Sequence, residues 1–146
     1  MRKRLNLNFT NHKMGEEVYL QKRTVLRFVY ELKNEGFILP RVEVKIGKPK
    51  NCNTLGVAIL KENKIYISDG AFIKGENFLR HTVYHELLHA IYGCEHDSKC
   101  HLMKAYQPSL VYGKDKLVSI FKKYYNKYNN IKQMEVAWRL KTIKKL

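Results

Sequence analysis

The residues with the clearest potential for chemistry lie in the segment His85-Glu86-Leu87-Leu88-His89. On a helix, residues four apart lie one turn apart on the same face, so His85 and His89 can both direct a ring nitrogen at one metal ion. Zinc binds such nitrogens at about 2.0–2.1 Å. Glu86 can reach a metal-bound water without binding the metal itself. The segment therefore predicts two metal ligands, a general base and an open coordination position.

The helix expected around this motif, Asn77–Tyr92, is amphipathic. Its apolar side chains share one face, and His85 and His89 fall on another, with Glu86 flanking them. A helix that is buried on one side and carries two histidines on another is the arrangement that a metal site needs. This context favours a metal site over a chance occurrence of the motif. The apolar face consists of Leu79, Val83, Leu87, Leu88, Ala90 and Ile91.

A catalytic zinc site normally takes a third ligand from the protein, and the candidates follow the helix. Gly93 marks the expected helix end, because glycine readily adopts the left-handed conformation that turns the chain back. His96 lies three residues further on and would complete a set of three histidines. Glu95 is its rival, since carboxylates also bind zinc. His101 is a third possibility, and we favour His96.

Residues 85–97, together with Cys100-His101-Leu102-Met103, resemble the signature of the metzincin zinc peptidases, most closely the archaemetzincin and matrixin-like branches. That family combines the pattern H-E-x-x-H-x-x-G-x-x-H with a later methionine-containing turn beneath the metal. The resemblance implies a small zincin-like fold and peptide hydrolysis with zinc as the cofactor. It implies that the zinc ligands are His85, His89 and His96, the general base is Glu86, the turn is made by Gly93 and the Met-turn residue is Met103.

The spacing departs from the family pattern by one residue. Three residues separate His89 from Gly93 where the family has two, so Glu95 rather than His96 stands at the family's ligand spacing. An extra or wider helical turn can absorb one inserted residue. The third ligand therefore stays open between His96 and Glu95.

Three further side chains near the motif have candidate roles. Tyr106, three residues past the expected Met turn, could stabilise the oxyanion, although a structural tyrosine is the alternative. Cys94 and Cys100 flank His96, and archaemetzincins carry cysteines at similar positions for a second zinc. With Cys52 the chain has an odd number of cysteines and no C-x-x-C follows, so we expect free thiols rather than a second zinc site.

The hydrophobic pattern predicts a single α+β domain over residues 1–146, in which a mixed twisted sheet is covered by a backing helix and the active-site helix. The sheet and the metal helix fall in 1–93, and the Met turn and a basic helical region in 94–146. Asp69-Gly70 should lead through a loop to the metal helix. The other expected elements are a strand around Leu5, Leu7 and Phe9, a helix over Gly15–Glu35, strands over Arg41–Ile46, Gly56–Leu60 and Lys64–Ser68, the last two as a hairpin, and a helix over Lys114–Tyr128.

The charge is strongly positive, at +15 for 146 residues. Residues 114–146 contain ten basic and two acidic residues, a net of +8. Such a charge creates a field that attracts polyanions, so contact with nucleic acid or an acidic partner is expected beside the simpler reading of a solvated face. No apolar run is long enough for a membrane helix, and the basic start has no apolar segment of a signal peptide behind it. We expect an intracellular, cytoplasmic protein or one packaged in a virion.

Three functions fit these observations. The favoured one is a zinc-dependent metallopeptidase acting on a peptide or protein substrate, with Glu86 as general base. The second is a zincin-fold protein that serves assembly, for instance as a component of a phage particle or another DNA-containing complex. The third is a zinc-dependent endoribonuclease, because bacterial rRNA-maturation enzymes have a similar three-histidine motif. Those enzymes carry glycine where this chain has Glu86, which favours peptide hydrolysis.

Overall fold

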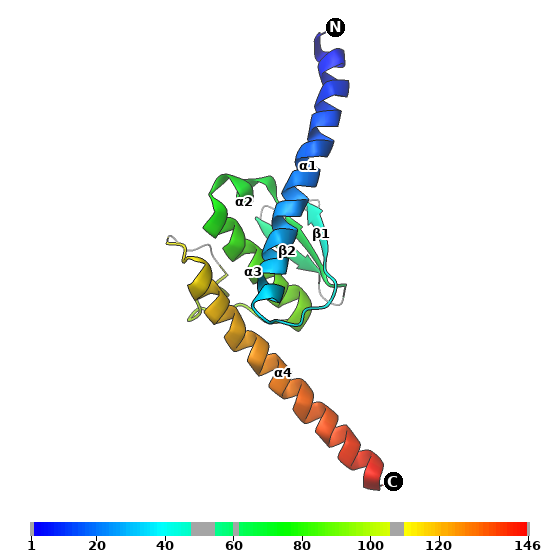
Figure 1. Cartoon of the computed structure of the whole chain (residues 1–146), viewed down its shortest axis with the longest axis vertical. Coiled ribbons are helices and arrows are strands. Elements are labelled where there is room, and N and C mark those ends of the chain that lie inside the picture. Colours follow the sequence, from blue (N-terminus) through cyan, green and yellow to red (C-terminus); the bar gives the residue numbers. More distant parts are fainter. Residues whose placement is uncertain (1, 48–54, 60–61, 106–109, 146) are drawn as a thin grey trace.

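A three-stranded mixed sheet packed against helices forms the core of the protein (Figure 1). The computed structural model describes the backbone of residues 2–47, 55–59, 62–105 and 110–145, and the side chains of residues 15–47, 55–59, 62–105 and 110–129. In chain order the elements are α1 (Arg2–Asn34), β1 (Glu43–Ile46), β2 (Gly56–Ile59), β3 (Lys64–Ile67), α2 (Asp69–Ile73), α3 (Glu76–Tyr92) and α4 (Lys114–Lys145).

The sheet has the strand order β1-β3-β2. β1 runs parallel to β3, and β2 runs antiparallel to β3, as the predicted hairpin requires. Asn63, in the connection between β2 and β3, has a φ of 48°, which is the left-handed conformation that asparagine tolerates in turns. β1 and β2 are edge strands, and neither pairs with a fourth strand among the residues that the structure describes.

One face of the sheet is covered by helices. Ile65 and Ile67 of β3 and Val44 of β1 are completely buried, whereas Lys64 and Tyr66 alternate with them and are partly exposed. α1 packs on β1, and α3 packs on β2 and β3. This period-two alternation is that of a sheet with a single covered face, and it confirms an α+β fold with a mixed sheet.

The packed part of α1 is the backing helix that the sequence predicts. Val25, Phe28, Val29 and Leu32 follow helical spacing and are all buried against the sheet and α3. The helix ends where Gly36, with a φ of 99°, donates its N–H to the Lys33 carbonyl. Each of the largest side chains contributes about 1.5–3 kcal/mol by leaving water.

Three expectations about the elements are corrected. The strand expected around residues 5–9 is wrong, because α1 begins at Arg2 and continues through this segment. No proline interrupts the chain before the packed turns, and extending an existing helix costs far less than starting one. The loop expected after Ser68 contains the short helix α2. Finally, α4 continues well past Tyr128, to Lys145.

α3 is the central element, since it contacts the sheet, α1, α2 and α4. Five of its six expected apolar positions are buried, and Ile91 is partly buried. Four polar side chains on its other faces are also buried, namely Arg80, His81, Thr82 and Glu86. α3 is therefore enclosed on more sides than its amphipathic pattern indicates.

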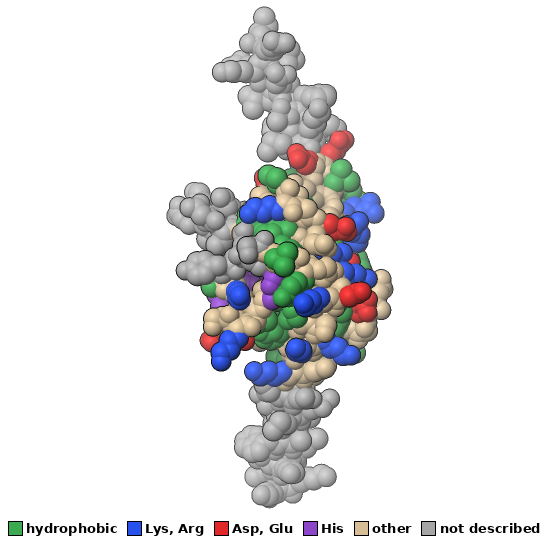
Figure 2. Space-filling view, turned by 90° about the vertical axis from the view of Figure 1, so that its left-hand side faces the viewer, with side chains coloured by type: hydrophobic (Ala, Val, Ile, Leu, Met, Phe, Trp, Pro, Cys, Tyr) green, Lys and Arg blue, Asp and Glu red, His purple; other side chains and the backbone are tan. Residues whose placement is uncertain are grey.

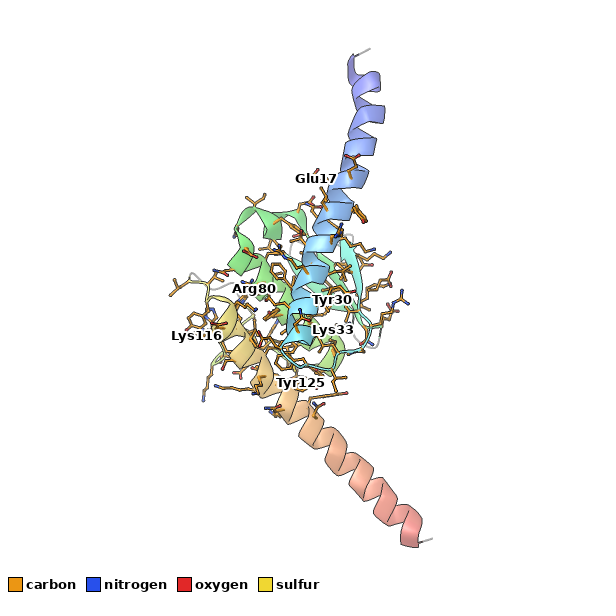
Figure 3. All side chains as sticks on the ribbon, viewed as in Figure 1. Glu17, Tyr30, Lys33, Arg80, Lys116 and Tyr125 are labelled. Carbon is orange, nitrogen blue, oxygen red and sulfur yellow. The ribbon has the colours of Figure 1, made fainter. Side chains whose placement is uncertain are left out.

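Arg80 ties α3 to α1 by a buried ion pair (Figure 3). Its Nε donates to Glu31 Oε1 at 2.7 Å and its Nη2 to Glu31 Oε2 at 3.2 Å, a two-pronged contact. The Tyr84 hydroxyl also donates to Glu31, and the third Arg80 nitrogen donates to Asn77 Oδ1 at 2.7 Å. These bonds satisfy a charged pair that would be costly to bury alone, and they hold α3 at a fixed position along α1.

The two long helices extend beyond the core in different directions, so the two ends of the chain lie far apart (Figure 1). α4 packs on α3 through its first half, where Leu117 and Phe121 are completely buried. Within the described residues, none of the helices has the length and apolar character that crossing a bilayer requires.

Candidate metal centre

Three histidines converge beside α3. His85 and His89 lie on successive turns of the helix, and His96 lies in the segment 93–103 that follows, here called the metal loop. One ring nitrogen from each histidine can be chosen so that all three lie within 4.8 Å of one another. The Nε2 atoms of His85 and His89 are 3.1 Å apart. The spacing of the motif thus brings the predicted residues together.

Backbone carbonyls orient the two helical histidines. The Nδ1 of His85 donates to the Leu102 carbonyl at 2.6 Å, and the Nδ1 of His89 donates to the Cys94 carbonyl. With its proton on Nδ1, a neutral imidazole presents a bare lone pair at Nε2. This is the outer hydrogen bonding that typically orients metal-binding histidines, and both carbonyls come from the metal loop.

The donor set fits a metal ion. Burial lowers the pKa of His85 to about 4, against the opposing effect of the Leu102 carbonyl, and burial also lowers the pKa of His89. Both rings are therefore neutral at pH 7, and their Nε2 lone pairs face each other. Two ligands at zinc distance in a tetrahedral site lie about 3.3–3.4 Å apart, close to the 3.1 Å found here. A cation between these lone pairs would turn their repulsion into binding.

His96 closes the third side of the cluster and leaves it open to solvent. Its ring centroid lies 4.7 Å from that of His89 and 5.2 Å from that of His85. His96 is exposed, whereas His85 and His89 are half-buried. A site with three protein ligands and an accessible fourth position is the arrangement of catalytic rather than structural zinc.

The end of α3 is wider than a regular helical turn. Gly93 adopts the left-handed conformation, with φ 65° and ψ 24°, and donates its N–H to the His89 carbonyl. The Cys94 N–H reaches back six residues to the Leu88 carbonyl at 3.2 Å. The wider turn is one of the two ways in which an additional residue can be accommodated, and it brings the metal loop back over the histidines.

The metal loop is held in place by its own hydrogen bonds and by the core. The Asp97 N–H donates to the Met103 carbonyl at 2.8 Å, and the Cys100 N–H donates to the Asp97 carbonyl at 3.1 Å. Leu102 and Met103 are completely buried in the hydrophobic core. Met103 thus anchors the loop one residue after the carbonyl that orients His85.

Glu86 is buried on α3, between the first two histidines in sequence, and lies against β2. Its side chain is next to Gly56: a Cβ at that position would come within 2.7 Å of Glu86 Oε2 and 2.8 Å of Glu86 Cγ. Burial raises the pKa of the Glu86 carboxyl to about 8. A cation held by the neighbouring histidines would favour the ionised form, so a carboxyl in this position suits the exchange of protons near neutral pH.

Several residues of the centre could not be named from the sequence. Leu102 and Cys94 act through backbone carbonyls, which leave no signature in side-chain types. A weak indication for Gly56 was present in the sequence, because a glycine within a strand often marks a position where another group approaches the backbone closely. His81 is buried, and its ring centroid lies 6.5 Å from that of His85, but His81 does not belong to the group of possible ligands.

The remaining candidates lie elsewhere. Within the described residues, the one group of potential ligands consists of the three histidines and includes neither Glu95, which is exposed, nor His101. His101 stacks instead on Tyr112, with ring centroids 3.7 Å apart. Cys94 and Cys100 form no disulfide and are half-buried. Tyr106 and Cys52 lie outside the described residues.

Comparison with protein-family models, with curated proteins and with solved structures reveals no detectable match to this chain.

Proposed function

We propose that this protein is a zinc metallopeptidase with a zincin-like fold. The observation that carries the proposal is the joint arrangement of three histidines and a buried glutamate. His85 and His89 present their Nε2 atoms 3.1 Å apart with both Nδ1 atoms tied to carbonyls, and His96 completes the set. The three nitrogen ligands favour zinc among the common metals.

The chemistry requires one contribution from the metal and several from the chain. A bound zinc ion would lower the pKa of a coordinated water toward about 7 and polarise the scissile carbonyl. Glu86, next to the first ligand and raised in pKa by burial, is suited to accept a proton and to return it to the leaving amine. The carbonyls of Leu102 and Cys94 keep both histidine rings in the tautomer that can bind.

The sheet offers a binding edge for an extended peptide. β2 is an edge strand, runs antiparallel to β3 and packs against α3, and Gly56 at its start adjoins Glu86. A peptide added along this edge would form backbone hydrogen bonds and pass close to the glutamate. This position of an edge strand beside the metal helix supports the zincin-like assignment.

Metal analysis and a peptidase assay on the same samples test the proposal. The wild-type chain should contain about one zinc per molecule and cleave an unstructured protein such as casein, and a chelator should abolish cleavage. Glu86→Gln, which keeps the shape of the side chain, should retain zinc and lose at least about 10²-fold in kcat. Undiminished cleavage by Glu86→Gln, or cleavage that resists the chelator, would exclude the mechanism.

The endoribonuclease alternative is tested in the same experiment. The glutamate at position 86 favours peptide hydrolysis, but the positive charge would suit an RNA substrate. Replacing casein by an unstructured RNA separates the two reactions. Metal-dependent RNA cleavage without peptide cleavage would replace the proposal made here.

A further inference from the structure

The metal loop, Tyr112 and the first half of α4 line an open pocket of about 490 Å³. The loop contributes Lys99, and α4 contributes Lys116, Lys123 and Lys127; these four lysines are here called the basic pocket lysines. In the view of Figure 2, histidine side chains reach the surface with Lys and Arg side chains close by. The pocket therefore adjoins the metal centre through the loop that orients its histidines.

The charge in this pocket is not balanced by the protein. Asp97 is the one acidic residue of the lining, and its Oδ1 already accepts the backbone N–H of Lys99 at 2.9 Å. Across the residues whose side chains the structure describes, no ion pair involves any of the four basic pocket lysines. Several like charges gathered in a hollow concentrate a positive potential that attracts anions.

The three pocket lysines of α4 are spread in a line along the helix rather than clustered at one position. Lys116, Lys123 and Lys127 are seven and four residues apart, so they lie on one face of the helix. At 1.5 Å per residue the line is about 16 Å long. A single phosphate or carboxylate would engage one end of it, whereas a chain of phosphates can follow its whole length. The pattern favours a linear polyanion.

Two tyrosines, Tyr112 and Tyr124, line the pocket together with these lysines. The Lys116 ammonium lies 3.9 Å from the centre of the Tyr112 ring. The same ring stacks on the imidazole of His101. This stack holds Lys116, in the first turn of α4 (Figure 3), before any ligand arrives. Tyr124, half-buried, lines the same pocket between Lys123 and Lys127. Lysines along a groove with an aromatic side chain between them, here Tyr124, are typical of surfaces that bind single-stranded nucleic acid.

We propose that the basic pocket binds a single strand of nucleic acid, with the lysines on its phosphates and one nucleotide seated in the hollow. The site goes beyond the proposed peptidase function and does not depend on it. It would place the metal centre next to nucleic acid, so that the centre acts on targets found there.

Fluorescence anisotropy of a labelled single-stranded 12-mer, measured with the full chain between 50 and 200 mM salt, tests this proposal. The triple variant Lys116→Gln, Lys123→Gln, Lys127→Gln should bind at least about tenfold more weakly. The slope of log K against log salt should fall by about 2, since each phosphate contact in a single strand contributes about 0.7.

The matched control removes the same charge outside the pocket. Lys22→Gln, Lys33→Gln, Arg41→Gln should change affinity less than about threefold, because none of these side chains lines the pocket and screened charges away from the ligand contribute little. Equal losses of affinity in the two triple variants would show that net charge alone binds nucleic acid, and would overturn the assignment of the binding site to the pocket. A poly-glutamate peptide that binds as tightly as the 12-mer, with the same dependence on the pocket lysines, would also overturn the assignment to nucleic acid.

Discussion

At the scale of single residues, Gly56 and Glu86 illustrate how the backbone shapes the proposed base. Glu86 is 5% exposed, and it lies so close to β2 that only a residue without a Cβ fits opposite it. The same enclosure is what raises the pKa of the carboxyl, because water that would solvate its charged form is excluded. The strand thus controls both the position and the proton affinity of this side chain.

Gly56→Ala should displace Glu86 without touching a metal ligand. The new methyl would lie 2.8 Å from Glu86 Cγ, which cannot move without moving the rest of the side chain. We expect zinc content to stay at the wild-type level and kcat to fall at least about tenfold, in line with a misplaced general base. Gly15→Ala is the control, since nothing lies within 4 Å of the added methyl. Full kcat in Gly56→Ala would show that Glu86 does not need this contact.

The third ligand is the residue whose role the sequence left open. His96, and not Glu95, lies with His85 and His89 in the structure. His96→Ala should therefore lower zinc content severely after dialysis, and Glu95→Ala should leave it nearly unchanged. Glu95 is a fair control because it is the neighbouring exposed residue. The reverse outcome, with zinc retained in His96→Ala, would assign the metal to other ligands.

The sequence predicted the histidines of this centre but not what orients them. Helical spacing brings His85 and His89 together in any helix, so the motif alone was enough. The carbonyls of Leu102 and Cys94 depend on the path of the metal loop, which in turn depends on Gly93 and on the buried Met103. Such long-range placement is decided by packing and has no local pattern.

At the scale of elements, the link between α1 and α3 determines where the metal helix sits. Arg80 and Glu31 have side chains only 7% and 15% exposed, and their pairing spans two helices. Burial tends to raise the pKa of Glu31, but the hydrogen bonds from Arg80 and Tyr84 and the charge of Arg80 prevail and lower it. The ionised carboxylate is thus favoured by the fold.

This pair should make stability depend on pH on the acid side. Because the pKa of Glu31 is lower in the folded chain than in the unfolded one, its contribution is complete above the unfolded pKa of about 4.3 and is lost as the pH falls through the folded value. Glu31→Gln should therefore lower the free energy of unfolding at pH 7 and flatten its decrease below about pH 5. Urea titrations at several pH values measure this.

The size of the effect distinguishes the buried pair from a surface one. Removing one partner of a buried pair typically costs about 3–5 kcal/mol. The exposed pair Arg27–Glu76, with both side chains about 60% exposed, supplies the control. Arg27→Gln, which removes this surface pair and leaves both partners of the buried pair in place, should cost under about 1 kcal/mol. Equal effects of the two substitutions would show that the Arg80 pair does not stabilise the contact between α1 and α3.

Helices and strands could be predicted from the sequence where the hydrophobic periodicity matches the face that is buried in the fold. β3 lies in one of the two apolar runs predicted as a hairpin, and the packed turns of α1 lie in the helix predicted over Gly15–Glu35. The strand predicted around residues 5–9 was wrong, because a short apolar alternation forms a strand only where a partner strand is available. Here the helix α1 extends through the segment instead. The burial of His81 and Arg80 was missed because it arises from neighbours on several sides of α3.

At the scale of the whole molecule, the candidate metal centre joins parts of the chain that pack separately. His85 and His89 belong to α3 in the core, and His96 belongs to the metal loop, which also forms one wall of the basic pocket. A ligand that binds both parts in the folded state, and finds no formed site in the unfolded state, stabilises the fold by mass action.

Zinc should therefore raise the melting temperature, whether or not the protein is a peptidase. At a free concentration of 100 times Kd, binding contributes about 2.7 kcal/mol. For a chain of this size that corresponds to a shift of about 5–10 °C between zinc and chelator. The double variant His85→Ala, His89→Ala should lose the shift, while His101→Gln should keep it, since His101 is outside the cluster. An undiminished shift in the double variant, measured by calorimetry, would place the stabilising metal elsewhere.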